Sequence, residues 1–239
     1  MKNKRPFAVP DKFGTRMIMM ILGIIVQAFG LSLLIRLELG TDPCTCLTLG
    51  VMKYIPIQVG TAQLICHLIN FAIVLKFDWS MIGFGTIGNM VCLGYINQFF
   101  GYIWDTFLPA DFFESNVVRY GLLIPVLAIF ILGAAAYMTA GLGTSPYDAV
   151  PFIIADRKQA AANHAISDSE TVTPQKKLSF KAVRMIWDIS YMAGGILLAA
   201  FSKDGFIFGE TVGIVTVVIA FGLGPVISWM QKIMSRLLQ

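Results

Sequence analysis

The sequence is poor in charged residues. Only 13% of its 239 residues are Asp, Glu, Lys or Arg, whereas about a quarter of the residues in soluble domains are charged. Hydrophobic residues make up 56% and gather in six runs that are each about 17 to 25 residues long, enough to cross a bilayer core. A soluble core does not need so many uniformly apolar helices, so we expect an all-α polytopic membrane protein. The six runs are 17–35, 59–75, 81–104, 117–138, 183–201 and 206–230.

The sequence also lacks the short motifs of common enzymes and cofactor sites. It contains no Gly-x-Ser-x-Gly, no His-Glu-x-x-His, no phosphate-binding P-loop and no dinucleotide fingerprint. Cys44 and Cys46 do not have the spacing or partners of a zinc site. We therefore expect no enzymatic activity, no cofactor and no metal. Without a nucleotide site, any transport would be driven by an ion gradient, by the solute's own gradient or by a separate subunit.

Basic residues are unevenly distributed along the chain and predict its orientation. The segment 1–16 carries five of them without a cleavage site, which indicates a retained cytoplasmic tail. The connection 105–116 has none and is expected outside the cell, whereas 156–181 and the end 231–239 are basic and expected inside. The net charge of +4 thus reports topology, not nucleic-acid binding.

Two stretches 103 residues apart are nearly the same. Leu39-Gly40-Thr41-Asp42-Pro43 and Leu142-Gly143-Thr144-Ser145-Pro146 each end an apolar run, which predicts two pseudo-symmetric repeats at 17–104 and 117–230. Thr86-Ile87-Gly88 resembles Thr211-Val212-Gly213 at a larger offset. We attribute the difference to a polar, flexible cytoplasmic insertion at 156–181 in the second repeat.

A short apolar segment follows each of these motifs. The segments 44–55 and 147–154 are too short to span comfortably and fit half-crossing or re-entrant helices, which proteins tolerate where other helices cover them. We expect three spanning helices plus one short helix in each repeat, so that the repeats are inverted. The alternative is four full helices in each repeat.

Three motifs, of which the first belongs to the repeated stretch, give the chain a resemblance to known proteins. Gly40-Thr41-Asp42-Pro43, Val59-Gly60-Thr61 and Gly85-Thr86-Ile87-Gly88-Asn89 are similar to motifs of the bacterial YczE/YitT-type membrane proteins, and the YczE branch is the nearer one. The resemblance covers the chain outside the insertion. It implies a multi-span plasma-membrane protein for which transport is the usual hypothesis, and it supplies no catalytic residues.

The repeated helix breaks are the first candidate site. Gly40 and Gly143 can end a helix, and the residues after them can cap the next one. A helix N-terminus inside the membrane attracts carboxylate or phosphate groups. Asp42 opposes an anion at the first end, which makes the Ser145 end the better acceptor. The alternative is that both ends are simply well-capped and packed. The candidate residues are Thr41, Asp42, Thr144, Ser145 and Asp148.

Polar residues within the predicted spans form the second candidate site. His67 and Asp188 lie at roughly corresponding positions of the two repeats and would be partners across the pseudo-axis. Because ionisable groups are costly inside a membrane, they usually face the bundle interior and find partners. Arg184, four residues before Asp188, could instead pair with it in a structural role. Asn89 follows the shared Thr-x-Gly and is either a ligand or a helix–helix contact.

These features favour a small secondary transporter for a polar metabolite, including an anionic or vitamin-like one. A passive channel and a non-transporting scaffold or regulator are the alternatives. The expected partners are the lipid bilayer and a small solute, while a second copy or an additional subunit stays open. The expected location is the bacterial plasma membrane, with both termini cytoplasmic.

Overall fold

The computed structural model is helical wherever it describes the chain, which is residues 6–109, 111–167, 180–203, 205 and 207–238. No strand occurs in these ranges. Short 3-10 turns follow α3 and α8. The helices are α1 (Phe13–Leu37), α2 (Pro43–Met52), α3 (Val59–Phe77), α4 (Phe84–Phe107), α5 (Asn116–Thr139), α6 (Pro146–Ser167), α7 (Phe180–Ala200) and α8 (Ile214–Met234).

Several helices are suited to cross a membrane. Four are long and apolar enough: α1, α3, α5 and the part of α7 at 182–200. Helix α8 adds a fifth if its two parts, bent by 57° at a break that contains Pro225, are taken as one span. The remaining predicted run, 81–104, forms the helix α4, but amides such as Asn89 and Asn97 keep it outside this set. The chain is a multi-pass membrane protein.

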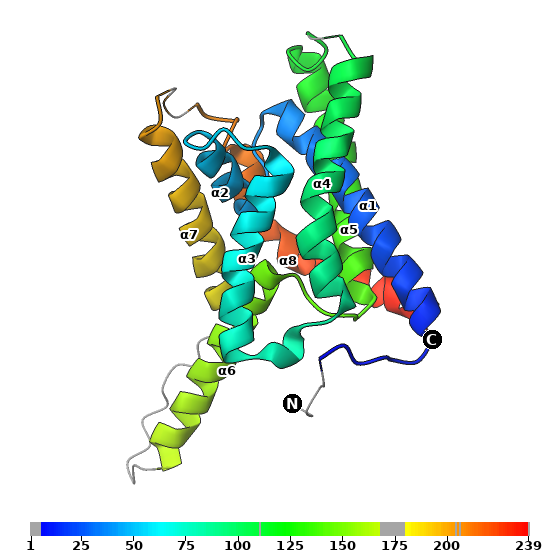
Figure 1. Cartoon of the computed structure of the whole chain (residues 1–239), viewed down its shortest axis with the longest axis vertical. Helices are drawn as coiled ribbons and strands as arrows, with labels where there is room; N and C mark the ends of the chain where they lie inside the picture. Colours follow the sequence, from blue (N-terminus) through cyan, green and yellow to red (C-terminus); the bar gives the residue numbers. More distant parts are fainter. Residues whose placement is uncertain (1–5, 110, 168–179, 204, 206, 239) are drawn as a thin grey trace.

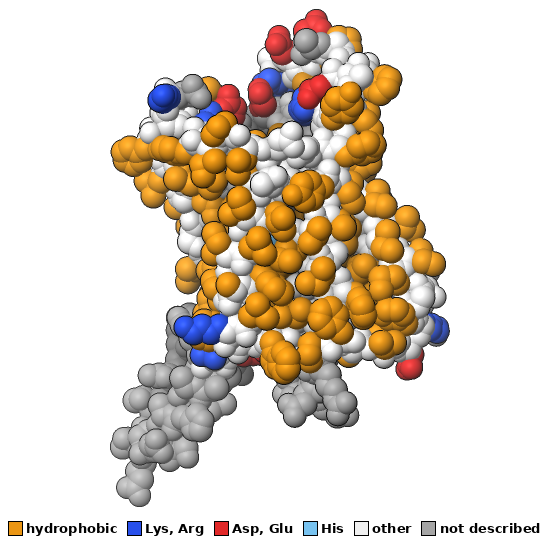
Figure 2. Space-filling model, in the orientation of Figure 1, with side chains coloured by type: hydrophobic (Ala, Val, Ile, Leu, Met, Phe, Trp, Pro, Cys, Tyr) orange, Lys and Arg blue, Asp and Glu red, His pale blue; other side chains and the backbone are white. Residues whose placement is uncertain are grey.

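The outer surface agrees with a membrane environment. Figure 2 shows hydrophobic side chains across the middle of the visible face, and Lys, Arg, Asp and Glu near its two ends. Large apolar side chains such as Ile69, Ile124 and Ile186 are at least 60% exposed. In a soluble protein such an extensive apolar surface would be unstable. It is the surface that contacts the bilayer.

The helices pack as two groups of four. The first bundle contains α1, α4, α5 and α8, and the second bundle contains α2, α3, α6 and α7. Contacts between α3 and α4 and between α7 and α8 join the two bundles. Figure 1 shows the second bundle on the left and the first on the right. Each bundle therefore draws two helices from each half of the chain.

Helices α1 and α5 form the closest pair and run in opposite directions (Figure 1). Glycines permit the approach. A Cβ at Gly133 would lie 2.2 Å from the backbone nitrogen of Gln27, and a Cβ at Gly23 would lie 2.4 Å from the backbone nitrogen of Tyr137. Larger side chains at these positions would push the helices apart. Small residues at helix–helix contacts are the usual way in which membrane helices pack tightly.

The two short segments have different outcomes. The first is short, as predicted, and forms the 10-residue helix α2. The second was expected to end near residue 154 and to lead into a flexible loop, but α6 continues to Ser167. The reason is composition, because 159–165 contains four alanines and one glutamine, which favour helix. The rest of the predicted insertion at 168–179, and residues 1–5 of the tail, lie outside the described residues.

Candidate functional site

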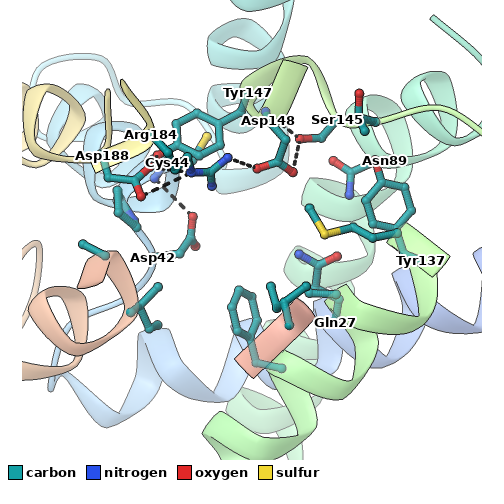
Figure 3. A pocket seen from close by; sticks show the side chains of 18 of the residues that line it. Gln27, Asp42, Cys44, Asn89, Tyr137, Ser145, Tyr147, Asp148, Arg184 and Asp188 are labelled. Atoms are coloured by element: carbon teal, nitrogen blue, oxygen red, sulfur yellow. Dashed lines mark hydrogen bonds and ion pairs between the residues drawn. The ribbon is translucent and has the colours of Figure 1, made fainter. Parts of the chain in front are cut away.

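A cavity of about 500 Å³ lies between the two bundles and is lined by residues of all eight helices. Seven of the eight predicted site residues line it, and Thr41 is the exception. Figure 3 shows side chains from both bundles around this space. The seven are Asp42, His67, Asn89, Thr144, Ser145, Asp148 and Asp188.

The first helix break packs against the start of α8. Gly40 has a φ of 100°, and a Cβ there would lie 2.5 Å from the Thr216 hydroxyl. The Thr41 N–H donates to the Thr216 hydroxyl at 3.1 Å, and the Val215 N–H donates to the Leu39 carbonyl at 3.1 Å. Thr41 is therefore occupied in holding the break to α8, which explains why it does not line the cavity.

The second helix break packs in the same way against the start of α4. Gly143 has a φ of 117°, and a Cβ there would lie 2.6 Å from the Thr86 hydroxyl. The Gly85 N–H donates to the Leu142 carbonyl at 2.8 Å. Each break thus rests on the N-terminus of the last helix of the other half.

This packing changes which residue of the second half corresponds to Thr86. The Thr86 hydroxyl accepts from the Gly83 N–H at 3.0 Å, and the Thr216 hydroxyl accepts from the Gly213 N–H at 3.2 Å. The counterpart of Thr86 is therefore Thr216, and the expected match with Thr211 is wrong by five residues. The Thr-x-Gly similarity is short, whereas both helices begin with the same Gly-x-x-Thr cap, at Gly83 and Thr86 and at Gly213 and Thr216.

Backbone N–H groups at the start of α2 and α6 already have acceptors. One Asp42 carboxylate oxygen accepts from the N–H groups of Cys44 and Thr45 at 3.1 and 3.2 Å. The Ser145 hydroxyl accepts from the Asp148 N–H at 3.1 Å and donates to the Asp148 carboxylate at 2.7 Å. These three N–H groups are thus not free for an anion, and a carboxylate stands at each helix end.

Arg184 is the centre of an ionic network on the second bundle. Its guanidinium lies 2.5 Å from Asp148 and 3.1 Å from Asp188, and it stacks over the Tyr147 ring. The Tyr147 hydroxyl also donates to Asp188. The Arg184–Asp188 pair predicted from helical spacing is confirmed. The contacts of Arg184 with Asp148 and of Tyr147 with Asp188 join different helices, so no sequence pattern predicts them.

Several buried polar atoms on the cavity wall have no partner among the described residues. Both ring nitrogens of His67 are among them, so His67 does not pair with Asp188 as expected. Sequence reasoning missed the residues on α1 and α5, which have no counterpart in the repeat motif. The other unpartnered atoms on the wall are Gln27 Oε1, Gln63 Oε1, Asn89 Oδ1, the Tyr137 hydroxyl and Thr144 Oγ1.

The two walls of the cavity differ in character. Gln27, Asn89 and Tyr137 belong to the first bundle and are uncharged, whereas Arg184 and Asp188 belong to the second bundle. Figure 3 shows the two sets on opposite sides of the open space, with Asp42 directed toward its middle. The arrangement can hold a small molecule between neutral hydrogen-bonding groups and charged groups.

Comparison with known proteins agrees with this membrane architecture. Residues 14–232 match the model of a family of unknown function, DUF6198. The chain is 27% identical over 139 residues to the uncharacterized membrane protein YczE of Bacillus subtilis (strain 168), which is 56% of this chain and 60% of that protein's length. No solved structure matches. With nearly its whole length covered by the family model, the chain belongs to the DUF6198 family.

Proposed function

We propose that the protein is a small secondary transporter that binds a polar solute in the cavity between its two bundles. The observation that carries the proposal is a cavity of about 500 Å³ that holds three carboxylates and one guanidinium inside a membrane protein. Its volume lies in the range of small-molecule sites, roughly 300–1,000 Å³. Ionisable residues within a membrane are costly and typically mark solute or ion pathways.

The proposal includes two inverted repeats, α1–α4 and α5–α8. The matched packing of the Gly40 and Gly143 breaks supports it, as does the opposite direction of α1 and α5 (Figure 1). In inverted-repeat transporters the solute site lies at the repeat interface, and broken helices contribute to it. The repeats supply two related arrangements of one scaffold, which alternating access requires.

Access to the cavity is unequal at its two ends. Lining side chains become exposed where α7 begins and α8 ends, as at Phe152, Phe180 and Ser228. The positions of basic residues favour a cytoplasmic location for this end. At the opposite end, Lys53 and Glu210 lie 2.6 Å apart and connect the turn after α2 to the segment before α8. The arrangement corresponds to a cavity open toward the inside.

Uptake into proteoliposomes tests the proposal. Vesicles with and without the protein would be incubated in a bacterial metabolite extract, and their contents compared by mass spectrometry. We expect saturable enrichment of a small set of solutes. Flux that does not saturate would indicate a channel, and no enrichment of any solute would overturn the proposal.

A matched pair of variants connects the flux to the cavity. Ala220→Trp places a large ring on the cavity wall and should abolish enrichment, whereas Ala200→Trp changes an exposed residue at the end of α7 and should not. Both should elute as folded protein in size-exclusion chromatography. Equal uptake by the two variants would place the solute path elsewhere.

A further inference from the structure

We infer that the solute is an organic cation, and that Asp42 is the carboxylate that binds its positive group. The inference rests on the proposed function, because it names the solute class of the same cavity. It differs from the expectation of an anionic solute, which the two helix breaks in the sequence favoured. Charge balance, hydrogen-bonding character and cavity size each support it.

Charge balance comes first. The carboxylates on the wall are Asp42, Asp148 and Asp188, and the one lining Lys or Arg is Arg184. Arg184 contacts both Asp148 and Asp188, so these three groups largely neutralise one another. No cationic side chain in the described part of the chain forms an ion pair with Asp42. The cavity thus contains one carboxylate without a counter-charge.

The cap of α2 satisfies Asp42 only in part. One carboxylate oxygen accepts the two N–H groups at the helix start, and the helix dipole offers roughly half a unit of positive charge. The carboxylate group itself faces the cavity (Figure 3). A cation that enters the cavity would complete the neutralisation in a site shielded from bulk water, where opposite charges attract strongly.

Buried polar residues of both bundles supply hydrogen-bond acceptors on the cavity wall. Gln63, His67 and Asn89 are only 2%, 3% and 2% exposed, and each has a polar atom on the cavity wall without a described partner. The amide oxygens of Gln27, Gln63 and Asn89 are all acceptors. A buried acceptor without a donor is unfavourable by about 1–3 kcal/mol. A solute that carries N–H donors would satisfy these atoms, and ammonium and guanidinium groups carry them.

Cavity size separates an organic cation from a bare metal ion. About 500 Å³ is far more than an ion needs. Among the described residues no group of three His, Cys, Asp or Glu side chains is arranged to hold a metal. The apolar lining near Phe130, Phe152 and Tyr147 would cover the carbon skeleton of a solute whose charged end lies at Asp42.

The test measures binding separately from transport. The purified protein in a neutral detergent would be screened for thermal stabilisation by several hundred metabolites graded by charge. The screen would include two triplets that differ only in charge: phenylethylamine, phenylethanol and phenylacetate, and diaminobutane, butanediol and succinate. We expect the stabilising compounds to be cations, and the uncharged and anionic members of a triplet to stabilise less.

Asp42→Asn is the decisive variant because Asn caps helices as well as Asp does. It should weaken binding of the cations at least about tenfold, since one side of a desolvated charge pair is removed. Asp111→Asn is the matched control: it removes the same charge from an exposed site outside the cavity and should leave binding unchanged.

Each outcome decides the inference. The inference is overturned if no cation stabilises the protein or if anions stabilise it more than cations do. It is also overturned if Asp42→Asn binds cations as tightly as the natural protein, or if sodium ions alone give the same thermal stabilisation as the organic cations. Cations that bind through Asp42 but are never taken up by proteoliposomes would leave this inference standing and remove the proposed transport. Saturable uptake of anions would leave the proposed transport standing and overturn the inference of a cationic solute.

Discussion

The two helix breaks have the same backbone arrangement but different chemistry. At both, a glycine with positive φ rests on a Gly-x-x-Thr cap of the other half. At the first break the cap of the next helix is Asp42, a carboxylate without an ionic partner in the described structure. At the second break the cap is Ser145, and the neighbouring Asp148 is paired with Arg184.

The difference separates the features that serve packing from the charges that the proposed solute site would use. Because both halves keep the glycine and the threonine contacts, those contacts hold the backbone together. The charges are not kept in the same pattern, and the asymmetry leaves a single free carboxylate in the cavity. Variants of the charged groups, the glycines and the threonines separate the parts of this comparison by their effects on stability.

Arg184→Met should have the largest effect. It leaves Asp148 and Asp188 without their cation, and breaking a buried pair typically costs about 3–5 kcal/mol. Since Arg184 is 26% exposed, we expect a loss of about 3 kcal/mol in the free energy of unfolding, measured by denaturant titration in detergent. Adding Asp148→Asn and Asp188→Asn should recover most of the loss. A single variant as stable as the natural protein would show that the network contributes nothing.

Gly40→Ala and Gly143→Ala should follow. Left-handed backbone costs an alanine about 1–2 kcal/mol, and at both positions the new methyl group meets backbone atoms of Gly213 or Gly83 within 3 Å. We expect each variant to lose about 2 kcal/mol in unfolding titrations. Gly121→Ala, where the methyl group meets open space, is the control. Losses that differ by more than twofold would contradict the equivalence of the breaks.

Thr216→Val and Thr86→Val should separate the two caps. The Thr216 hydroxyl accepts from the N–H groups of Thr41 and Gly213, so its loss leaves two buried donors unpaired. The Thr86 hydroxyl accepts from one, Gly83. We expect Thr216→Val to be less stable than Thr86→Val by about 1 kcal/mol. The reverse order in the same titration would show that the Thr216 hydroxyl is not the contact that holds the break at Gly40.

Asp42→Asn should have the smallest effect on stability. Asparagine keeps the cap of α2, so we expect the free energy of unfolding to change by less than about 0.5 kcal/mol, whereas Asp42→Ala loses about 1 kcal/mol. Together with the expected loss of cation binding, this would separate the charge of Asp42 from its structural role. A large destabilisation by Asp42→Asn would mean that the charge itself holds the fold.

Sequence patterns predicted the features that are local in the chain. Long apolar runs gave the helices, the repeated Leu-Gly-Thr motif located both breaks, and helical spacing predicted the Arg184–Asp188 pair. Contacts between distant helices were beyond such patterns. Nothing near Arg184 in the sequence points to Asp148, and nothing near Gln27 points to a cavity, because both depend on how the bundles pack.

Two errors have a physical cause in common. The match of Thr86 to Thr211 and the expected loop after residue 155 both treated short polar stretches as if composition alone fixed their place. A helix cap depends on the spacing of Gly213 and Thr216, and an alanine-rich stretch stays helical after its apolar face has ended. Spacing and intrinsic helix propensity would have corrected both predictions.

The division of the helices between the bundles has a consequence for the evolution of this architecture. Each half of the chain contributes a pair of helices to either bundle, so neither half contains a complete one. Under the repeat architecture proposed above, a single ancestral copy of the half would have had to associate with a second copy before any enclosed chamber could exist. On the same proposal, the two copies differ in charge, because one has the acidic cap Asp42 and the other has Asp148 paired with Arg184.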